Sequence, residues 1–174
     1  MTNPDTESAD HVQRRGEAWE LGLQGEYDAA LKLIGALLTE SSSDLVALRM
    51  KGNLLELKTL DLMEYSSKKL MSSRDYLAAR DCYMQILKFD PQNISALIDL
   101  GDHYKNLDAY DKAFSFYEQA IDLLRSDRRG KSRTEELDEL LTTCLDLGRQ
   151  KQTAERAQRL KLACEQLLLG EHGS

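Results

Sequence analysis

Small and apolar residues recur along this sequence with a period of about 34 residues, a length typical of stacked helical hairpins. One such period separates Ala79 from Ala113, and each has a tyrosine three positions before it and another four positions after it. Ala30 has similar neighbours, with Tyr27 before it and Ile34 after it, but the interval from Ala30 to Ala79 exceeds one period by fifteen positions. The pattern predicts three repeated units, one of which contains an insert.

A second set of small residues locates the insert. Ala18 and Gly52 are one period apart, whereas the interval from Gly52 to Gly101 is longer by the same fifteen positions. In the first set the long interval comes before the short one, whereas in this set it comes after it. The extra residues must lie between Gly52 and Tyr76, and we place this insert at about residues 58–72.

Each unit is predicted to be a pair of helices. In the third unit, apolar residues follow the helical period over two successive stretches, one around Gly101 and the other around Ala113. A small residue at these positions allows two helix axes to come close together. The run Asp90-Pro91-Gln92-Asn93 is typical of a helix end followed by a new helix start. Leucine is abundant and valine is rare, which also favours an all-α fold over strands.

On these residues the sequence resembles the tetratricopeptide repeat family. The match is closest over Ile94 to Arg125, where eight residues fit the family's signature: Leu97, Leu100, Gly101, Tyr104, Tyr110, Ala113, Tyr117 and Ala120. The first unit departs from it, because Arg14 and Glu17 stand where bulky apolar residues are usual. The resemblance implies a right-handed α–α superhelix with three repeats over residues 11–125.

The two ends of the chain have different compositions. Residues 1–10 are polar and acidic, and we expect them to be disordered. A basic loop is predicted at residues 126–133, followed by a C-terminal capping helical hairpin over residues 134–170 that covers the last apolar face of the array. The net charge is −7, the three cysteines are widely spaced, and no stretch has the length and apolar character of a membrane span. We therefore expect a cytoplasmic protein with reduced thiols and no membrane insertion.

The insert contains six large side chains that need a cover: Leu60, Leu62, Met63, Tyr65, Leu70 and Met71. Because Leu48, Leu55 and Leu62 are spaced by seven positions, one helix from Asp44 to about Ser72 is the first interpretation. A separate short helix folded back on the array is the alternative. The apolar side chains would either pack within the monomer or form a surface for self-association as a homodimer, or for a partner.

Periodicity also predicts an inner face. Residues three before and one after each small packing residue share one side of the first helix of a unit, and another residue follows about one turn further on. In the resembling family, these positions line a concave groove that holds an extended or helical peptide. They are Arg15, Trp19 and Leu23, then Arg49, Asn53 and Glu56, and finally Ile98, Asp102 and Lys105.

The charges of this predicted groove indicate a type of ligand. Trp19, Arg15 and Arg49 lie toward one end and Asp102 toward the other, which suits a segment with an acidic or carboxylate group beside an apolar anchor. The alternative is that these are solvated side chains on a face that binds nothing.

The sequence thus predicts a non-catalytic protein-interaction module or scaffold that binds a protein or peptide. A small export or secretion chaperone is the alternative, because that class resembles this chain in repeat number, size and acidity. Nucleic-acid binding through the basic loop is less favoured, since aromatic residues for stacking are missing from it. Asp99, Asp102 and His103 form the best candidate for catalysis or metal binding, because Asp99 and His103 are four positions apart and could share a metal ion or a proton. No third metal ligand is evident beside this pair, so neither an enzyme nor a cofactor is expected.

Overall fold

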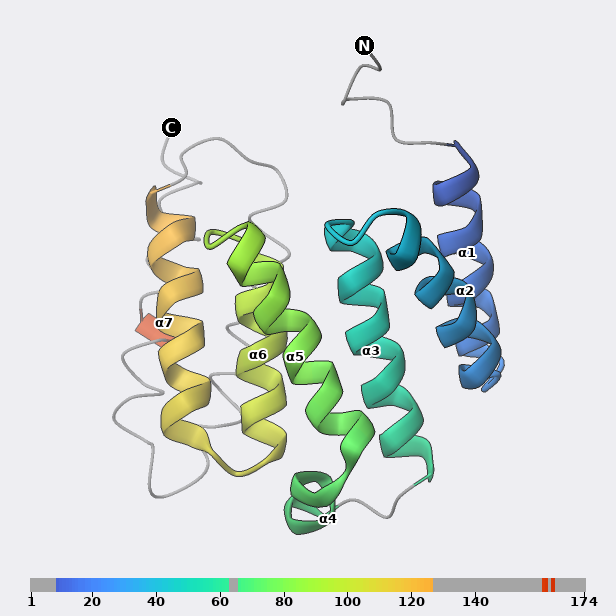
Figure 1. Ribbon diagram of the computed structural model, residues 1–174. Coiled ribbons are helices and arrows are strands. Elements are labelled where there is room, and N and C mark those ends of the chain that lie inside the picture. The colour runs from blue at the N-terminus through green and yellow to red at the C-terminus, as the bar shows by residue number, and fades with distance from the viewer. Residues whose placement is uncertain (1–8, 63–65, 127–160, 163, 165–174) are drawn as a thin grey trace. The chain divides into compact units, whose positions relative to one another are not determined.

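A computed structural model describes residues 9–62, 66–126, 161, 162 and 164 of the chain (Figure 1). It divides into two compact units, Met1–Pro91 and Gln92–Ser174, and each is described here by itself. Throughout the described residues the regular structure is helical, as the leucine-rich composition and the helical period predict.

Within its described residues, the first unit contains five helices. Helix α1 (Ala9–Leu23) pairs with α2 (Tyr27–Glu40), and α3 (Leu45–Leu62) pairs with α5 (Arg74–Phe89). The short helix α4 (Ser67–Ser72) lies between α3 and α5 in the chain and packs against α5. Helix α3 also contacts α2 and α1, so the two hairpins share one core. Figure 1 shows the order of these helices.

The second unit contains the third hairpin, in which α6 (Ile94–Asn106) packs against α7 (Tyr110–Ser126). The three predicted units therefore correspond to three helix pairs. Most of the predicted basic loop and capping hairpin lies outside the described residues. Of the described part, Ser126 is the last residue of α7, Lys161, Leu162 and Cys164 are helical, and Cys164 is buried.

Helix starts are fixed by polar side chains at the predicted breaks. The Asp44 carboxylate accepts a hydrogen bond of 2.9 Å from the backbone N–H of Ala47, and the Asn93 side chain accepts one of 3.0 Å from Ala96. Ser73 caps α5 in the same way. Each cap satisfies a backbone donor that has no partner inside its own helix.

Glycine and tyrosine form the repeated packing contact inside the second and third hairpins. A Cβ atom built on Gly52 would lie 2.4 Å from the Tyr83 ring, and one built on Gly101 would lie 2.1 Å from the Tyr117 ring. Both rings are completely buried. The missing side chain on the inner helix is therefore what admits a tyrosine from the outer helix. In the first hairpin Ala18 and Ile34 belong to one buried cluster, so a larger residue than glycine and a smaller one than tyrosine occupy the corresponding positions.

Two hairpins are closed by a residue in the left-handed backbone region. Gly25 has φ of 82° and Asp108 has φ of 57°, and the two residues occupy corresponding positions of the first and third repeats. After Gly25, the N–H of Glu26 donates to the carbonyl of Leu21, and Ala109 forms the corresponding bond after Asp108. This pattern is the Schellman motif, which ends a helix and satisfies its last carbonyl groups.

The second hairpin has a different connection. Thr59, one repeat period after Gly25, is helical and buried, and its hydroxyl donates to the carbonyl of Leu55 at 2.8 Å. Helix α3 ends at Leu62, and Ser66 has extended backbone angles. A single helix reaching Ser72 is therefore wrong, and the insert has the alternative arrangement with a separate short helix.

The N-terminal boundary also differs from the prediction. Helix α1 begins at Ala9, so Ala9 and Asp10 are helical instead of belonging to a disordered segment of residues 1–10. Asp10 lies in the first turn, where a carboxylate interacts favourably with the positive end of the helix dipole.

A candidate protein-interaction face on helices α1 and α3

Helix α1 exposes a stripe of large apolar side chains. Val12, Trp19 and Leu23 are all solvent-exposed, and Leu23 retains 70% of its accessible surface. Their spacings of seven and four positions place them on one side of the helix. Gly16 lies between them on the same side, and a Cβ atom built on it would contact nothing within 4 Å. The stripe is therefore open to solvent along three turns.

Helix α3 continues this surface. Val46 and Leu57 lie one repeat period after Val12 and Leu23, at the corresponding positions of the second repeat, and both are exposed. Helices α1 and α3 are in contact, and a Cβ atom on Gly22 would lie 2.4 Å from the Leu54 side chain. We call this surface the α1–α3 face and define it by five exposed residues: Val12, Trp19, Leu23, Val46 and Leu57.

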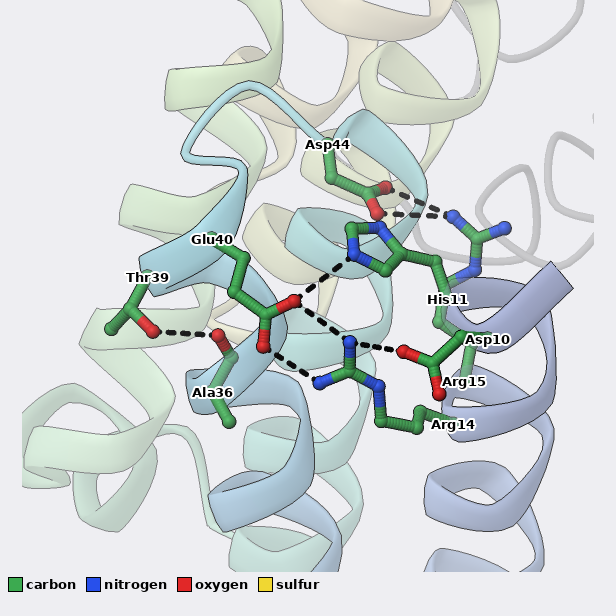
Figure 2. A network of polar contacts seen from close by, with 8 residues as sticks. All are labelled: Asp10, His11, Arg14, Arg15, Ala36, Thr39, Glu40 and Asp44. Carbon is green, nitrogen blue, oxygen red and sulfur yellow. Dashed lines mark hydrogen bonds and ion pairs between the residues drawn. The ribbon is translucent and has the colours of Figure 1, made fainter. Parts of the chain in front are cut away.

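The polar residues predicted to line the groove have bonds inside the protein. Arg15 is buried, and its guanidinium Nη1 lies 3.1 Å from both carboxylate oxygens of Asp44. Because Asp44 also caps α3, this ion pair joins the middle of α1 to the start of α3 (Figure 2). Arg15 is thus part of the hairpin packing.

Asn53 has a comparable internal role. Its side-chain oxygen accepts a hydrogen bond of 2.9 Å from the hydroxyl of Tyr83, the ring that packs on Gly52. The neighbouring predicted groove residues Arg49 and Glu56 are half-buried, and both take part in interactions within the protein.

The third set of predicted groove residues lies on α6, in the other unit. Ile98 is buried. Asp102 accepts a hydrogen bond of 2.8 Å from the Tyr117 hydroxyl and also pairs with Lys105, one turn further along the helix. The arrangement repeats that of Asn53 and Tyr83, since in both hairpins the residue after the glycine accepts the tyrosine hydroxyl.

A separate polar network joins the two helices of the first hairpin (Figure 2). Both terminal nitrogens of Arg14 donate to the Glu40 carboxylate at 2.8 Å, and Arg14 also pairs with Asp10. His11 Nε2 lies 3.2 Å from the same carboxylate. The hydrogen bonds from Arg14, together with the smaller effect of His11, lower the pKa of Glu40 to about 2. This network explains why a base is acceptable at a position where the repeat pattern usually has an apolar residue.

The insert residues have different degrees of exposure. Leu62 and Met71 retain 73% and 61% of their accessible surface, whereas Leu60 is half-buried and Leu70 is buried. Leu70 therefore packs within the protein and cannot contact a partner. The remaining two predicted self-association residues, Met63 and Tyr65, lie outside the described residues.

Ion pairs fasten the end of α3 beside the insert. Lys58 Nζ lies 2.7 Å from Asp28 on α2 and 3.4 Å from Asp75 on α5, and these carboxylates raise the pKa of Lys58. The Tyr27 hydroxyl donates to Asp61 on the following turn. The final turns of α3 are thus held to both neighbouring helices.

The candidate catalytic residues belong to the packing of the third hairpin. His103 is completely buried, and its ring lies edge-on to that of Tyr104, with 5.7 Å between centroids. Across the described part of the chain, no three His, Cys, Asp or Glu side chains are grouped so that they could hold a metal ion. Within the same residues, no helix combines the length and apolar character needed to cross a bilayer.

Comparisons with known proteins agree with this architecture. The sequence pattern that describes the tetratricopeptide repeat matches residues 94–126. Among solved structures, the MamA RS-1 ArsTM double mutant is similar, with a TM-score of 0.60 and 16% sequence identity, covering 97% of this chain and 80% of that chain. A crystal structure of MamA covers 90% of this chain and 97% of its own, with 14% identity and a TM-score of 0.42. Among curated proteins, none matches the sequence.

The paired helices and the first of these structural likenesses define an all-helical repeat protein with an α–α superhelical fold. Within this fold, residues 94–126 match the tetratricopeptide repeat, and the glycine–tyrosine contact of that repeat also occurs in the second hairpin. Repeats of this type support a protein-interaction scaffold as the general kind of function.

Sequence reasoning missed three members of the α1–α3 face. Val12, Val46 and Leu57 were not among the predicted groove residues, although the repeat period relates Val12 to Val46 and Leu23 to Leu57. Applying the repeat to positions six before and five after the small residue would have found them. Several of the polar residues that were predicted to line the groove are instead bonded within the protein, among them Arg15 and Asn53.

Proposed function

We propose that this protein is a non-catalytic scaffold or adaptor that binds a protein segment on its α1–α3 face. The proposal is supported by one observation above all, namely that apolar side chains at corresponding positions of two neighbouring repeats remain exposed. Exposed apolar surface that continues over two elements is a mark of an interaction site. The predicted groove residues Trp19 and Leu23 belong to this face, whereas Arg15 and Asn53 support it from within.

A photo-crosslinking amino acid in place of Leu23 tests this proposal in cells. We expect it to capture a specific protein, and we expect the substitution Val46→Glu to reduce that capture strongly, because a carboxylate would be buried against apolar surface. The same crosslinker in place of Phe89 is the control, since Phe89 is also an exposed apolar residue but lies at the end of α5. Capture that is unchanged by Val46→Glu would contradict the proposal.

We propose the insert as a second surface, through which the protein forms homodimers. Leu62 and Met71 are exposed at its two ends, which supports a contact made by both side chains. Sedimentation of the double variant Leu62→Glu, Met71→Glu beside the original chain tests this proposal. A dimer that persists in the double variant would contradict it.

The roles of export chaperone and nucleic-acid binding stay predictions. The basic loop at residues 126–133, on which nucleic-acid binding depends, lies outside the described residues. A partner that is captured only before its transport across a membrane would favour the chaperone role over a scaffold.

A further inference from the structure

The α1–α3 face has few polar groups left for a ligand. Arg15 is paired with a carboxylate, Asn53 accepts a tyrosine hydroxyl, and Arg49 and Glu56 each take part in interactions within the protein. An extended peptide laid on such a surface would lose water from backbone groups that need new hydrogen-bond partners. A helix satisfies those groups internally. Because the polar side chains of this face already interact within the protein, the face favours a helical ligand over an extended one.

The dimensions of the apolar stripe agree with a helical ligand. Val12 and Leu23 are eleven positions apart, which corresponds to about 16 Å along a helix. A ligand helix of three turns presents apolar side chains at intervals of three and four residues, and these can lie against the side chains of α1 and α3. Trp19, in the middle of α1, supplies the large aromatic contact that often dominates binding energy.

The charges around the stripe indicate which charge the ligand should have beside its apolar side. Between Ala9 and Asp44 the chain has seven acidic and three basic residues, a net charge of −4. Two of the bases, Arg14 and Arg15, are paired with carboxylates. Glu20 is exposed on the solvent side of the stripe, next to Trp19 in sequence, and Glu17 is exposed one turn before it. Basic side chains on the ligand would complement this edge.

We propose that the occupant of the α1–α3 face is an amphipathic helix of about three turns, with an apolar side and basic residues beside it. This inference rests on the proposed function and makes it specific. It replaces the acidic ligand predicted from Arg15 and Arg49, because the structure pairs Arg15 with Asp44.

Three synthetic peptides test the proposal with the full chain. The first is a helical peptide with leucines along one side and lysines beside them, the second has glutamate in place of every lysine, and the third is the first with two central prolines that prevent a helix. Because Trp19 is the only tryptophan in the chain, its fluorescence reports binding at this face directly. Titration at physiological salt gives the three dissociation constants.

We expect the lysine peptide to bind at least about tenfold more tightly than either of the others. Leu23→Glu should weaken its binding by more than about tenfold, since an apolar contact is lost and a charge is buried. Glu20→Lys should weaken it by about threefold, as is typical of an exposed ion pair. Phe89→Glu and Asp81→Lys, both on α5, place similar charges elsewhere and should have no effect.

Each part of the proposal can fail separately. Equal or tighter binding of the glutamate peptide would show that the basic flank is wrong, and equal binding of the proline peptide would show that the helix is wrong. If no peptide changes the Trp19 fluorescence, or if Leu23→Glu leaves binding unchanged, the whole inference is overturned. The crosslinking experiment at Leu23 does not use these peptides, so the proposed function would then stand or fall on its own result.

Discussion

At the scale of single residues, one tyrosine in each of two hairpins has two partners on the facing helix. The ring of Tyr83 fills the space over Gly52 while its hydroxyl donates to Asn53, and Tyr117 does the same with Gly101 and Asp102. Burying a hydroxyl is acceptable when it is hydrogen-bonded. The residue after the glycine is thus selected as an acceptor for the buried tyrosine, which limits what it can offer to a ligand.

The glycine contact predicts opposite effects at two glycines. Gly52→Ala should destabilise the protein by about 1–3 kcal/mol, because the new methyl group would lie within 3 Å of the Tyr83 ring. Gly35→Ala in α2 should instead stabilise it by about 0.5–1 kcal/mol, since the helix loses a flexible residue and the new Cβ meets nothing within 4 Å. Urea unfolding of the two variants measures both effects. Equal changes in the free energy of unfolding of the two variants would contradict the close contact between Gly52 and Tyr83.

The buried ion pair predicts that Arg15 contributes to stability. Arg15→Ala leaves the carboxylate of Asp44 poorly compensated, with its side chain only 10% exposed. We expect a loss of about 3 kcal/mol in the free energy of unfolding. Thermal and urea unfolding measure it, with Arg49→Ala as the comparison on the next inner helix. A loss of less than about 1 kcal/mol in the free energy of unfolding would mean that water compensates the Asp44 carboxylate as well as Arg15 does.

The network around Glu40 predicts a dependence of stability on pH. Since the pKa of Glu40 falls from 4.5 to about 2 in the folded protein, its contribution is present above pH 4.5 and is lost as the pH falls toward 2. Glu40→Gln should therefore lower stability at pH 7 and flatten the dependence between these values. Glu17→Gln, which removes an exposed carboxylate outside this network, is the control variant. Parallel curves for Glu40→Gln and the original chain would contradict the network.

At the scale of helices, the connections differ more than the helices themselves. Gly25 and Asp108 close two hairpins in the left-handed region, whereas Thr59 continues α3 as helix at the corresponding position. A β-branched residue strongly disfavours the left-handed region, so the second hairpin cannot use the same turn. The extra turns of α3 and the separate helix α4 replace it.

The turn geometry predicts the effect of a substitution. Gly25→Ala should destabilise the first hairpin by about 1 kcal/mol, because alanine is strained at a φ of 82°. Asp108→Gly should be neutral or slightly stabilising by the same reasoning, although it removes a hydrogen bond from the Tyr110 hydroxyl. Equilibrium unfolding of both variants checks the signs. Destabilisation by Asp108→Gly well beyond that by Gly25→Ala would contradict this explanation.

Much of the element order could be predicted from the sequence, since the repeat fixes the glycine and tyrosine positions and the capping residues fix the helix starts. The break within the insert could not. Leu48, Leu55 and Leu62 continue the helical spacing, and nothing in that pattern reveals the extended backbone at Ser66. The groove stays a prediction: Trp19 and Leu23 are exposed, but periodicity cannot show that Arg15 turns toward Asp44. Pairing between distant side chains depends on tertiary geometry.

At the scale of the whole molecule, a buried cysteine offers a measure of stability. Cys82 lies on α5 of the first unit, and burial raises the pKa of its thiol. Because alkylation requires an accessible thiolate, iodoacetamide should label Cys82 more than about a hundredfold more slowly in the native protein than in urea. Mass spectrometry of the labelled peptide gives the rate. Rapid labelling without urea would show that α5 opens independently of global unfolding.

The connection between α3 and α5 also gives the protein a place where its length can vary. The tight turns after Gly25 and Asp108 hold the ends of their helices at a fixed separation, so an added residue there would break the hydrogen bonds that close them. In the middle hairpin, Lys58 and Tyr27 secure the last turns of α3, and Ser73 caps the start of α5 after the insert. The insert is therefore the natural position for a fluorescent tag or an added binding loop, which would leave the stacked hairpins and the α1–α3 face intact.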